Sequence, residues 1–167
     1  MKQKLDLEFE RAIRFLVNKY PPSNKNSRKP ILAHALRVGT FFYRNKYPRE
    51  IILAGLLHDV LEFSKTTAYE FKKIFGAKIL KLVKACTKDD SISDPREKTE
   101  ELIKRCARAG KAALIVKTAD ILDSFEYYTA MNKKDQLDYC QRNARAILKF
   151  KSPKFNDKIF CQLEKWI

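Results

Sequence analysis

The chain has few residues that break helices. Its 167 residues include four glycines and six prolines, whereas 45% of the residues are hydrophobic. This composition excludes a collagen-like, low-complexity or disordered chain, and the length is sufficient to bury a core without disulfides or structural metals. We therefore expect a compact globular protein.

Long apolar runs are absent as well. No stretch approaches the roughly 18 to 20 residues that cross a bilayer. Acidic residues enter at Asp6 and Glu8, so the N-terminus does not resemble a secretory signal. Without an apolar span or a signal, we expect no membrane partner. The four cysteines form no C-x-x-C pair, which argues against a zinc finger. They are predicted to be reduced, core-filling thiols in a cytoplasmic protein. These cysteines are Cys86, Cys106, Cys140 and Cys161.

Acidic residues are also in deficit. The chain has 35 Lys and Arg against 20 Asp and Glu, a formal net charge of +15. Such a charge attracts polyanions, either nucleotides or nucleic acid. A solvated lysine-rich surface explains the same numbers, so charge alone does not select a partner.

Apolar residues recur at three- and four-residue spacing through most of the chain, which predicts an all-α, multi-helix fold in a single domain, residues 1–167. Thr67 and Glu70 have the spacing of a capping box, and Asp94 before Pro95 is a good N-cap. Polar residues 23–29 form a loop. The predicted helices are residues 5–20, 30–46, 49–62, 70–75, 77–86, 95–109, 111–131, 134–150 and 156–166.

The predicted helix 49–62 contains polar residues at unusual places. His58, Asp59 and Glu62 follow the apolar run 51–57, and their spacing places them on roughly one helical face. Burying a carboxylate without a partner costs several kcal/mol. A bound metal ion is one way to stabilise Asp59 there.

Two further polar residues lie in apolar helices. His34 is the only other histidine, and Asp120 follows the apolar run 112–116. A lone helical histidine is usually a packed core residue, but two imidazoles and two carboxylates in such settings suggest a common cause. This mixed nitrogen and oxygen set suits Mn²⁺, Fe²⁺ or Zn²⁺ better than Ca²⁺ or Mg²⁺.

The order His34, His58-Asp59, Asp120 resembles the H…HD…D signature of the HD superfamily of metal-dependent phosphohydrolases. The surrounding residues are similar to the hydrolase domain of RelA/SpoT homologues and small alarmone hydrolases, which remove the 3′-pyrophosphate of (p)ppGpp using Mn²⁺. The similarity covers about residues 5–150 and leaves the C-terminal helix, about 156–166, outside.

The resemblance assigns roles residue by residue. It makes His34, His58, Asp59 and Asp120 the metal ligands. Glu62 matches the first acid of the family's Glu-Asp pair, which orients or deprotonates the attacking water. The residues that match substrate-binding positions are Arg28, Lys29, Arg96, Ser124 and Tyr139.

Two positions depart from the family pattern. Phe63 stands where the family has the second acid, and it can neither accept a proton nor hold a water molecule. Ser124 replaces an Asn that touches the nucleotide, and its hydroxyl reaches less far than an amide. Asp123 is expected at the surface, and Tyr139 fits core packing equally well.

The resemblance implies an enzyme that hydrolyses the 3′-pyrophosphate of (p)ppGpp or a related nucleotide. No synthetase domain follows within the 167 residues, so we expect hydrolysis only. One alternative is an HD-type phosphatase or nucleotidase acting on another phosphorylated nucleotide. A second, favoured by Phe63, is a non-catalytic module that binds nucleotides or nucleic acid; nucleic-acid binding would be sensitive to salt.

Overall fold

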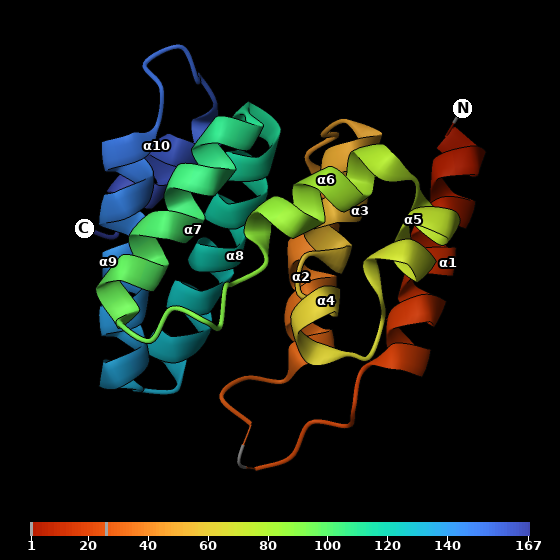
Figure 1. Ribbon diagram of the computed structural model, residues 1–167, viewed down its shortest axis with the longest axis horizontal. Coiled ribbons are helices and arrows are strands. Elements are labelled where there is room, and N and C mark those ends of the chain that lie inside the picture. Colours follow the sequence, from red (N-terminus) through yellow and green to blue (C-terminus); the bar gives the residue numbers. More distant parts are fainter. Residues whose placement is uncertain (1, 26) are drawn as a thin grey trace. The chain divides into compact units, whose positions relative to one another are not determined.

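The computed structural model describes residues 2–25 and 27–167, so Asn26 of the predicted loop 23–29 lies outside the described residues. Within this part of the chain the structure has ten helices and no strand, which confirms the all-α prediction (Figure 1). None of the helices is long and apolar enough to cross a membrane. The helices are α1 Lys2–Lys19, α2 Ile31–Arg44, α3 Arg49–Leu57, α4 Val60–Phe63, α5 Ala68–Phe75, α6 Ala77–Cys86, α7 Pro95–Ala109, α8 Lys111–Ala130, α9 Lys134–Phe150 and α10 Lys158–Glu164.

Local capping chemistry explains several helix ends. The Thr67 hydroxyl accepts a hydrogen bond from the Glu70 amide at 3.1 Å, as the capping-box spacing predicts. The Asp94 carboxylate accepts from the backbone amides of Arg96 and Glu97 and so caps α7. Gly110 separates α7 from α8 at φ +117°, a backbone conformation that favours glycine.

The predicted helix 49–62 is wrong in one respect that matters for the site. It ends at Leu57, and α4 begins at Val60 after a turn at His58 and Asp59. Asp59 has ψ of −2°, and its carbonyl accepts from the amides of both Glu62 and Phe63. Its side chain makes no cap hydrogen bond to α4, because the carboxylate faces two histidines instead. The interaction of this carboxylate with the imidazoles outweighs helix continuation.

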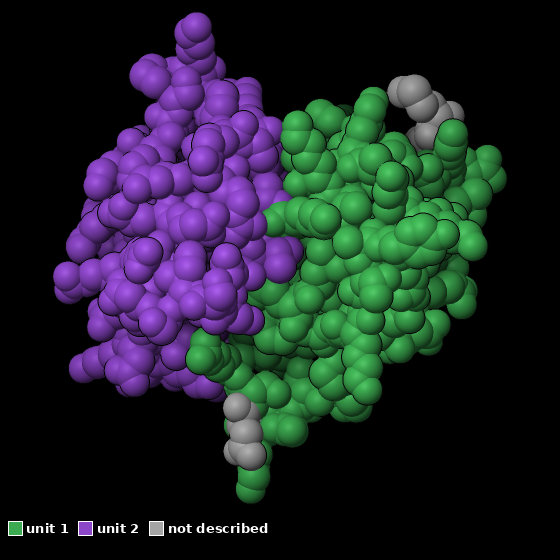
Figure 2. Space-filling view, in the orientation of Figure 1, with its two compact units in different colours: residues 1–84 green, residues 85–167 purple. Residues whose placement is uncertain are grey.

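The chain divides into two compact units, residues 1–84 and 85–167 (Figure 2). In the first unit α3 packs against α2 and α1. Two glycines bring α2 and α3 close together: a Cβ on Gly39 would lie 2.8 Å from the Leu56 Cβ, and one on Gly55 would lie 2.4 Å from the Phe42 ring. No larger residue fits at this crossing without movement, so the glycines set the spacing of the two helices.

The second unit packs α7, α8 and α9 against one another, and α10 lies against α8. The Trp166 ring stacks on Phe125 of α8 at 4.9 Å, so the closing segment packs on this unit's own core. Cys86, Cys106 and Cys140 are buried free thiols, as predicted, but Cys161 is exposed on the short helix α10, which contradicts its assignment to the core. The apolar pattern of a seven-residue helix was too short to tell its two faces apart.

Candidate metal centre

Two buried histidines meet in the first unit. His34 lies on α2 and His58 follows α3, and their Nε2 atoms are 3.1 Å apart with the rings edge to face. Both side chains are almost fully buried. The glycine-lined crossing of α2 and α3 allows this approach, since each histidine is within five residues of a glycine of that crossing.

A backbone carbonyl fixes the tautomer of His58. The Nδ1–H of His58 donates to the Gly55 carbonyl oxygen at 2.8 Å, because a carbonyl can only accept. The Nε2 atom of the neutral ring therefore carries the lone pair, directed toward His34 and Asp59. Metal-binding imidazoles commonly donate their second N–H in this way.

Asp59 completes a convergent set of ligand atoms within this unit. Its Oδ2 atom lies 3.3 Å from the His58 Nε2 and 3.7 Å from the His34 Nε2. Ligand atoms bound to one divalent ion at about 2.0 to 2.2 Å stand roughly 3 Å apart. Two nitrogens and a carboxylate oxygen thus form an electron-rich cluster that fits a divalent transition metal, and these three predicted ligands are brought together.

Cationic residues precede this cluster in the chain. The Lys29 ammonium donates to the His34 Nε2 at 2.9 Å, so this nitrogen, the one that lies against His58, carries no proton. Lys29 is half-buried, whereas Arg28 beside it is exposed. The loop therefore holds one positive charge against the histidines and presents another to solvent.

Tyr20 is a residue at this cluster that sequence reasoning missed. Its hydroxyl is buried and has no hydrogen-bond partner among the described residues. Burial raises the pKa of Tyr20 well above its ordinary value, and the negative charges of Asp59 and Glu62 raise it further. Tyr20 and the half-buried Glu62 therefore belong to the same region as Asp59, whereas Phe63 is 43% exposed. The only signal in the sequence was an aromatic residue just before Pro21.

Asp120 lies in the second unit, on the buried stretch of α8. Its Oδ2 atom accepts from the Lys117 ammonium at 2.7 Å, and both side chains are buried. Asp123, which we expected at the surface, is also buried. Every residue of α8 from Ala113 to Phe125 is buried, so the helix has no exposed face where Asp123 lies. The place of Asp120 in the metal centre stays a prediction.

Comparison with known proteins identifies the family. The family model described as "HD domain" matches residues 12–147, most of the chain and both of its units. The chain belongs to the HD domain family. This match confirms the resemblance that the residues His34, His58-Asp59 and Asp120 indicated.

Curated relatives of this HD domain carry one recurring name. The guanosine-3′,5′-bis(diphosphate) 3′-pyrophosphohydrolase of Aquifex aeolicus is 31% identical over 119 residues, which make up 70% of this chain and 17% of that enzyme. The enzyme of the same name from Danio rerio is 34% identical over 73 residues, 44% of this chain and 40% of that enzyme. The HD domain described here thus spans less than half the length of either relative.

Solved structures agree on the fold of this HD domain. A structure described as a metazoan ortholog of SpoT that hydrolyses ppGpp has a TM-score of 0.75 at 20% identity, covering 95% of this chain and 93% of that one. A Listeria monocytogenes protein has a TM-score of 0.66 at 22% identity, covering 84% of this chain and 96% of that one. At these identities the likeness establishes the shared fold.

Three predicted substrate-binding residues of the HD domain lie in the second unit. Ser124 is buried on α8 and donates its hydroxyl to the Asp120 carbonyl at 2.8 Å. Arg96 is exposed in the first turn of α7. Tyr139 is half-buried on α9, where the Lys88 ammonium lies 5.9 Å from its ring centroid. Their role in binding, like that of Arg28 and Lys29, stays a prediction.

Proposed function

We propose that this HD domain is a metal-dependent phosphohydrolase that removes the 3′-pyrophosphate of (p)ppGpp or a closely related nucleotide. The observation that carries the proposal is the convergence of His34, His58 and Asp59 in a chain of the HD family. The names of the relatives from Aquifex aeolicus and Danio rerio support the substrate.

We propose four metal ligands: His34, His58, Asp59 and Asp120. The first three supply the cluster described above, and Asp120 is the buried acid of the second unit at the family's fourth motif position. Mn²⁺ suits this nitrogen and oxygen set, as do Fe²⁺ and Zn²⁺. When bound, such an ion acts as a Lewis acid and lowers the pKa of a bound water.

In the proposed reaction Glu62 takes the proton of the attacking water. Glu62 is half-buried, and its charge acts on the Tyr20 hydroxyl together with that of Asp59, which supports its place beside the metal ligands. Water adds to the phosphorus atom next to the 3′ oxygen, and the bond to that oxygen breaks. The 3′ oxygen leaves as a hydroxyl after it receives a proton, for which the proton taken by Glu62 is the source, and pyrophosphate carrying the water oxygen is the second product. Phe63 contributes no acid, so Glu62 acts alone.

Substrate binding falls to residues on several elements. Arg28 and Lys29 in the loop before α2, and Arg96 in the first turn of α7, offer positive charge to phosphate groups. Ser124 and Tyr139 offer hydroxyls.

We propose that the two units work as one hydrolase domain, residues 1–167, because the family model runs across the boundary between them. The buried free thiols of Cys86, Cys106 and Cys140 agree with the reducing cytoplasm as its compartment.

One observation favours a second substrate class. The Ser124 hydroxyl donates within its own helix, to the Asp120 carbonyl, so its single proton is not available to a nucleobase. Weaker recognition of guanine would suit an HD-type phosphatase acting on another phosphorylated nucleotide. Such an enzyme would release phosphate and not pyrophosphate.

The test is a nucleotide panel with Mn²⁺, read by separate phosphate and pyrophosphate assays. We expect pyrophosphate from ppGpp, and a loss of activity of about a hundredfold or more in Glu62→Gln with bound metal retained. Glu164→Gln, an exposed residue at the end of α10, is the matched control and should behave as wild type. His58→Ala should lose both metal and activity. If no nucleotide in the panel is hydrolysed by metal-loaded protein, the proposal is wrong.

A further inference from the structure

The second unit contains a cleft between α7 and α9. Its volume is about 740 Å³, within the range of small-molecule sites. From α9 it is lined by Asp138, Arg142, Arg145 and Lys149, which recur at i, i+4, i+7 and i+11 and so share one helical face. Arg96 and Glu100 line it from α7, again four residues apart.

Two of the acids along this cleft are already engaged. The Asp94 carboxylate caps α7 through the amides of Arg96 and Glu97. Glu100 pairs with Lys104 at 3.1 Å and with Lys149 at 3.5 Å, and these cations hold the pKa of Glu100 below its ordinary value. The negative charges of these two acids are therefore already paired with groups of the protein.

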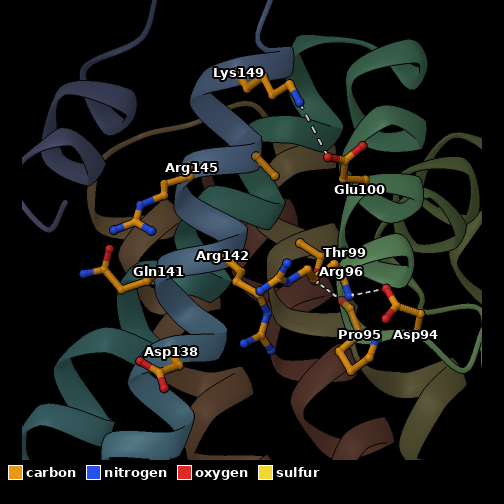
Figure 3. A pocket seen from close by; sticks show the side chains of 11 residues that line it. Asp94, Pro95, Arg96, Thr99, Glu100, Asp138, Gln141, Arg142, Arg145 and Lys149 are labelled. Atoms are coloured by element: carbon orange, nitrogen blue, oxygen red, sulfur yellow. Dashed lines mark hydrogen bonds and ion pairs between the residues drawn. The ribbon is translucent and has the colours of Figure 1, made fainter.

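The arginines have no such partners. Within residues 2–25 and 27–167, no side-chain hydrogen bond or ion pair joins Arg96, Arg142 or Arg145 to another residue. The Arg142 Nε is buried and lacks an acceptor. Figure 3 shows Arg96 reaching from α7 toward α9, and Arg142 projecting from α9 into the same space. The guanidinium groups of Arg96 and Arg142 thus lie in the same space, Arg145 adds a further positive charge to the lining, and the one remaining acid is the exposed Asp138.

We propose that this cleft binds the phosphate group of a small phosphorylated ligand. A buried guanidinium N–H without an acceptor is destabilising, and a phosphate oxygen is the acceptor that matches guanidinium geometry best. A second guanidinium beside it repels the first unless an anion lies between them. The concave shape and the volume favour a nucleotide-sized ligand over the extended backbone of a nucleic acid.

This site differs from the proposed active site in all but one of its cationic residues and in needing no metal. Its residues all lie in the second unit, and anion binding by guanidinium groups requires no metal. Arg96 is the one residue shared with the proposed substrate-binding set, and Arg142 and Arg145 are new. Binding should therefore persist when the metal is removed, whereas hydrolysis should not.

The experiment is a calorimetric titration of the full chain with inorganic pyrophosphate in the presence of EDTA. We expect one site per chain, and a loss of affinity of about tenfold or more in Arg142→Gln and in Arg96→Gln. Arg108→Gln removes the same charge from the exposed end of α7, outside the cleft, and should change affinity less than about twofold.

A fourth variant reverses the sign of the effect. Asp138→Asn removes the remaining acid and should tighten pyrophosphate binding severalfold, a result that damaged folding would not produce. The proposal is overturned if Arg142→Gln and Arg108→Gln weaken binding equally, since the attraction would then be diffuse. It is also overturned if EDTA abolishes binding. It is equally overturned if the wild-type chain does not bind pyrophosphate but binds unrelated DNA, and Arg142→Gln weakens that DNA binding.

Discussion

The His58 Nδ1–H donates to the carbonyl oxygen of Gly55, and the same glycine admits the Phe42 ring against α3. One residue therefore sets both the tautomer of His58, a proposed metal ligand, and the distance between α2 and α3 beside the two histidines. If His58 binds metal as proposed, packing and metal binding are coupled at Gly55.

Gly55→Ala should lower the free energy of unfolding by about 1 to 3 kcal/mol, because the new Cβ would lie 2.4 Å from the Phe42 ring. Urea denaturation measures this change. The displaced Gly55 carbonyl should also reduce manganese bound at limiting metal, measured by atomic spectroscopy. Phe42→Leu in the same chain should recover part of the lost stability, and additive effects of the two substitutions would refute the predicted clash.

Lys117→Met should make the fold depend on metal. The buried Lys117 ammonium lies 2.7 Å from the Asp120 carboxylate, so its removal should destabilise the metal-free protein by about 3 to 5 kcal/mol. If Asp120 is a ligand, Mn²⁺ should raise the Tm more in this variant than in wild type. Lys111→Met, exposed on the same helix, is the control. If Mn²⁺ raised the Tm equally in all three proteins, Asp120 would not be a metal ligand.

Phe63→Asp should increase turnover of the proposed substrate. Phe63 is 43% exposed, so the change should alter stability by less than about 1 kcal/mol. A second acid beside Glu62 could share proton transfer, which typically contributes a hundredfold or more to rate. We expect kcat for pyrophosphate release to rise at least about tenfold. A Phe63→Asn control separates proton transfer from the loss of the ring, and equal rates in both would count against a missing acid.

Tyr20→Phe should stabilise the protein. The Tyr20 hydroxyl is buried and has no hydrogen-bond partner among the residues described, so deleting it removes an unsatisfied polar group and keeps the ring. We expect the free energy of unfolding to rise by about 1 kcal/mol in urea denaturation. Tyr20→Leu, which loses the ring, should be less stable than wild type. A less stable Tyr20→Phe would show that the hydroxyl is satisfied in solution.

Glu8 should contribute a small, pH-dependent part of stability. A hydrogen bond from Arg49 lowers the pKa of Glu8 below its ordinary value of 4.5, with the second Arg49 nitrogen at 3.0 Å. A lowered carboxyl pKa stabilises the fold above pH 4.5, and that stability is lost as the pH falls through the folded-state value. Because Arg49 is 43% exposed, solvent screening limits the effect to less than about 1 kcal/mol. Urea denaturation from pH 3 to 7 should show a flatter profile for Glu8→Gln than for the Glu10→Gln control.

Much of the fold was predictable because it depends on local chemistry. Thr67, Asp94 and Gly110 mark helix ends through hydrogen bonds and backbone angles that involve only neighbouring residues. The break after Leu57 was not predictable, because it follows from contacts of Asp59 with residues on two helices. No local pattern distinguishes a turn at His58 and Asp59 from another helical turn.

The candidate site divides in the same way. His34, His58 and Asp59 were recognisable because imidazole and carboxylate side chains are unusual in apolar helices. Tyr20 was not recognisable, because an aromatic residue at a helix end has no distinctive signal. Its hydroxyl is relevant to the site only because folding brings it near Asp59 and Glu62. The isolation of Arg142 likewise depends on how α7 and α9 pack, since its sequence neighbourhood includes an acid four residues earlier.

The contact of Lys29 with His34 implies a competition for one nitrogen. The His34 Nε2 has one lone pair, so it accepts either the Lys29 proton at 2.9 Å or a metal ion. The contact with Lys29 and a bound metal ion therefore exclude each other at His34. We expect metal binding at this nitrogen to shift a positive charge within the loop before α2.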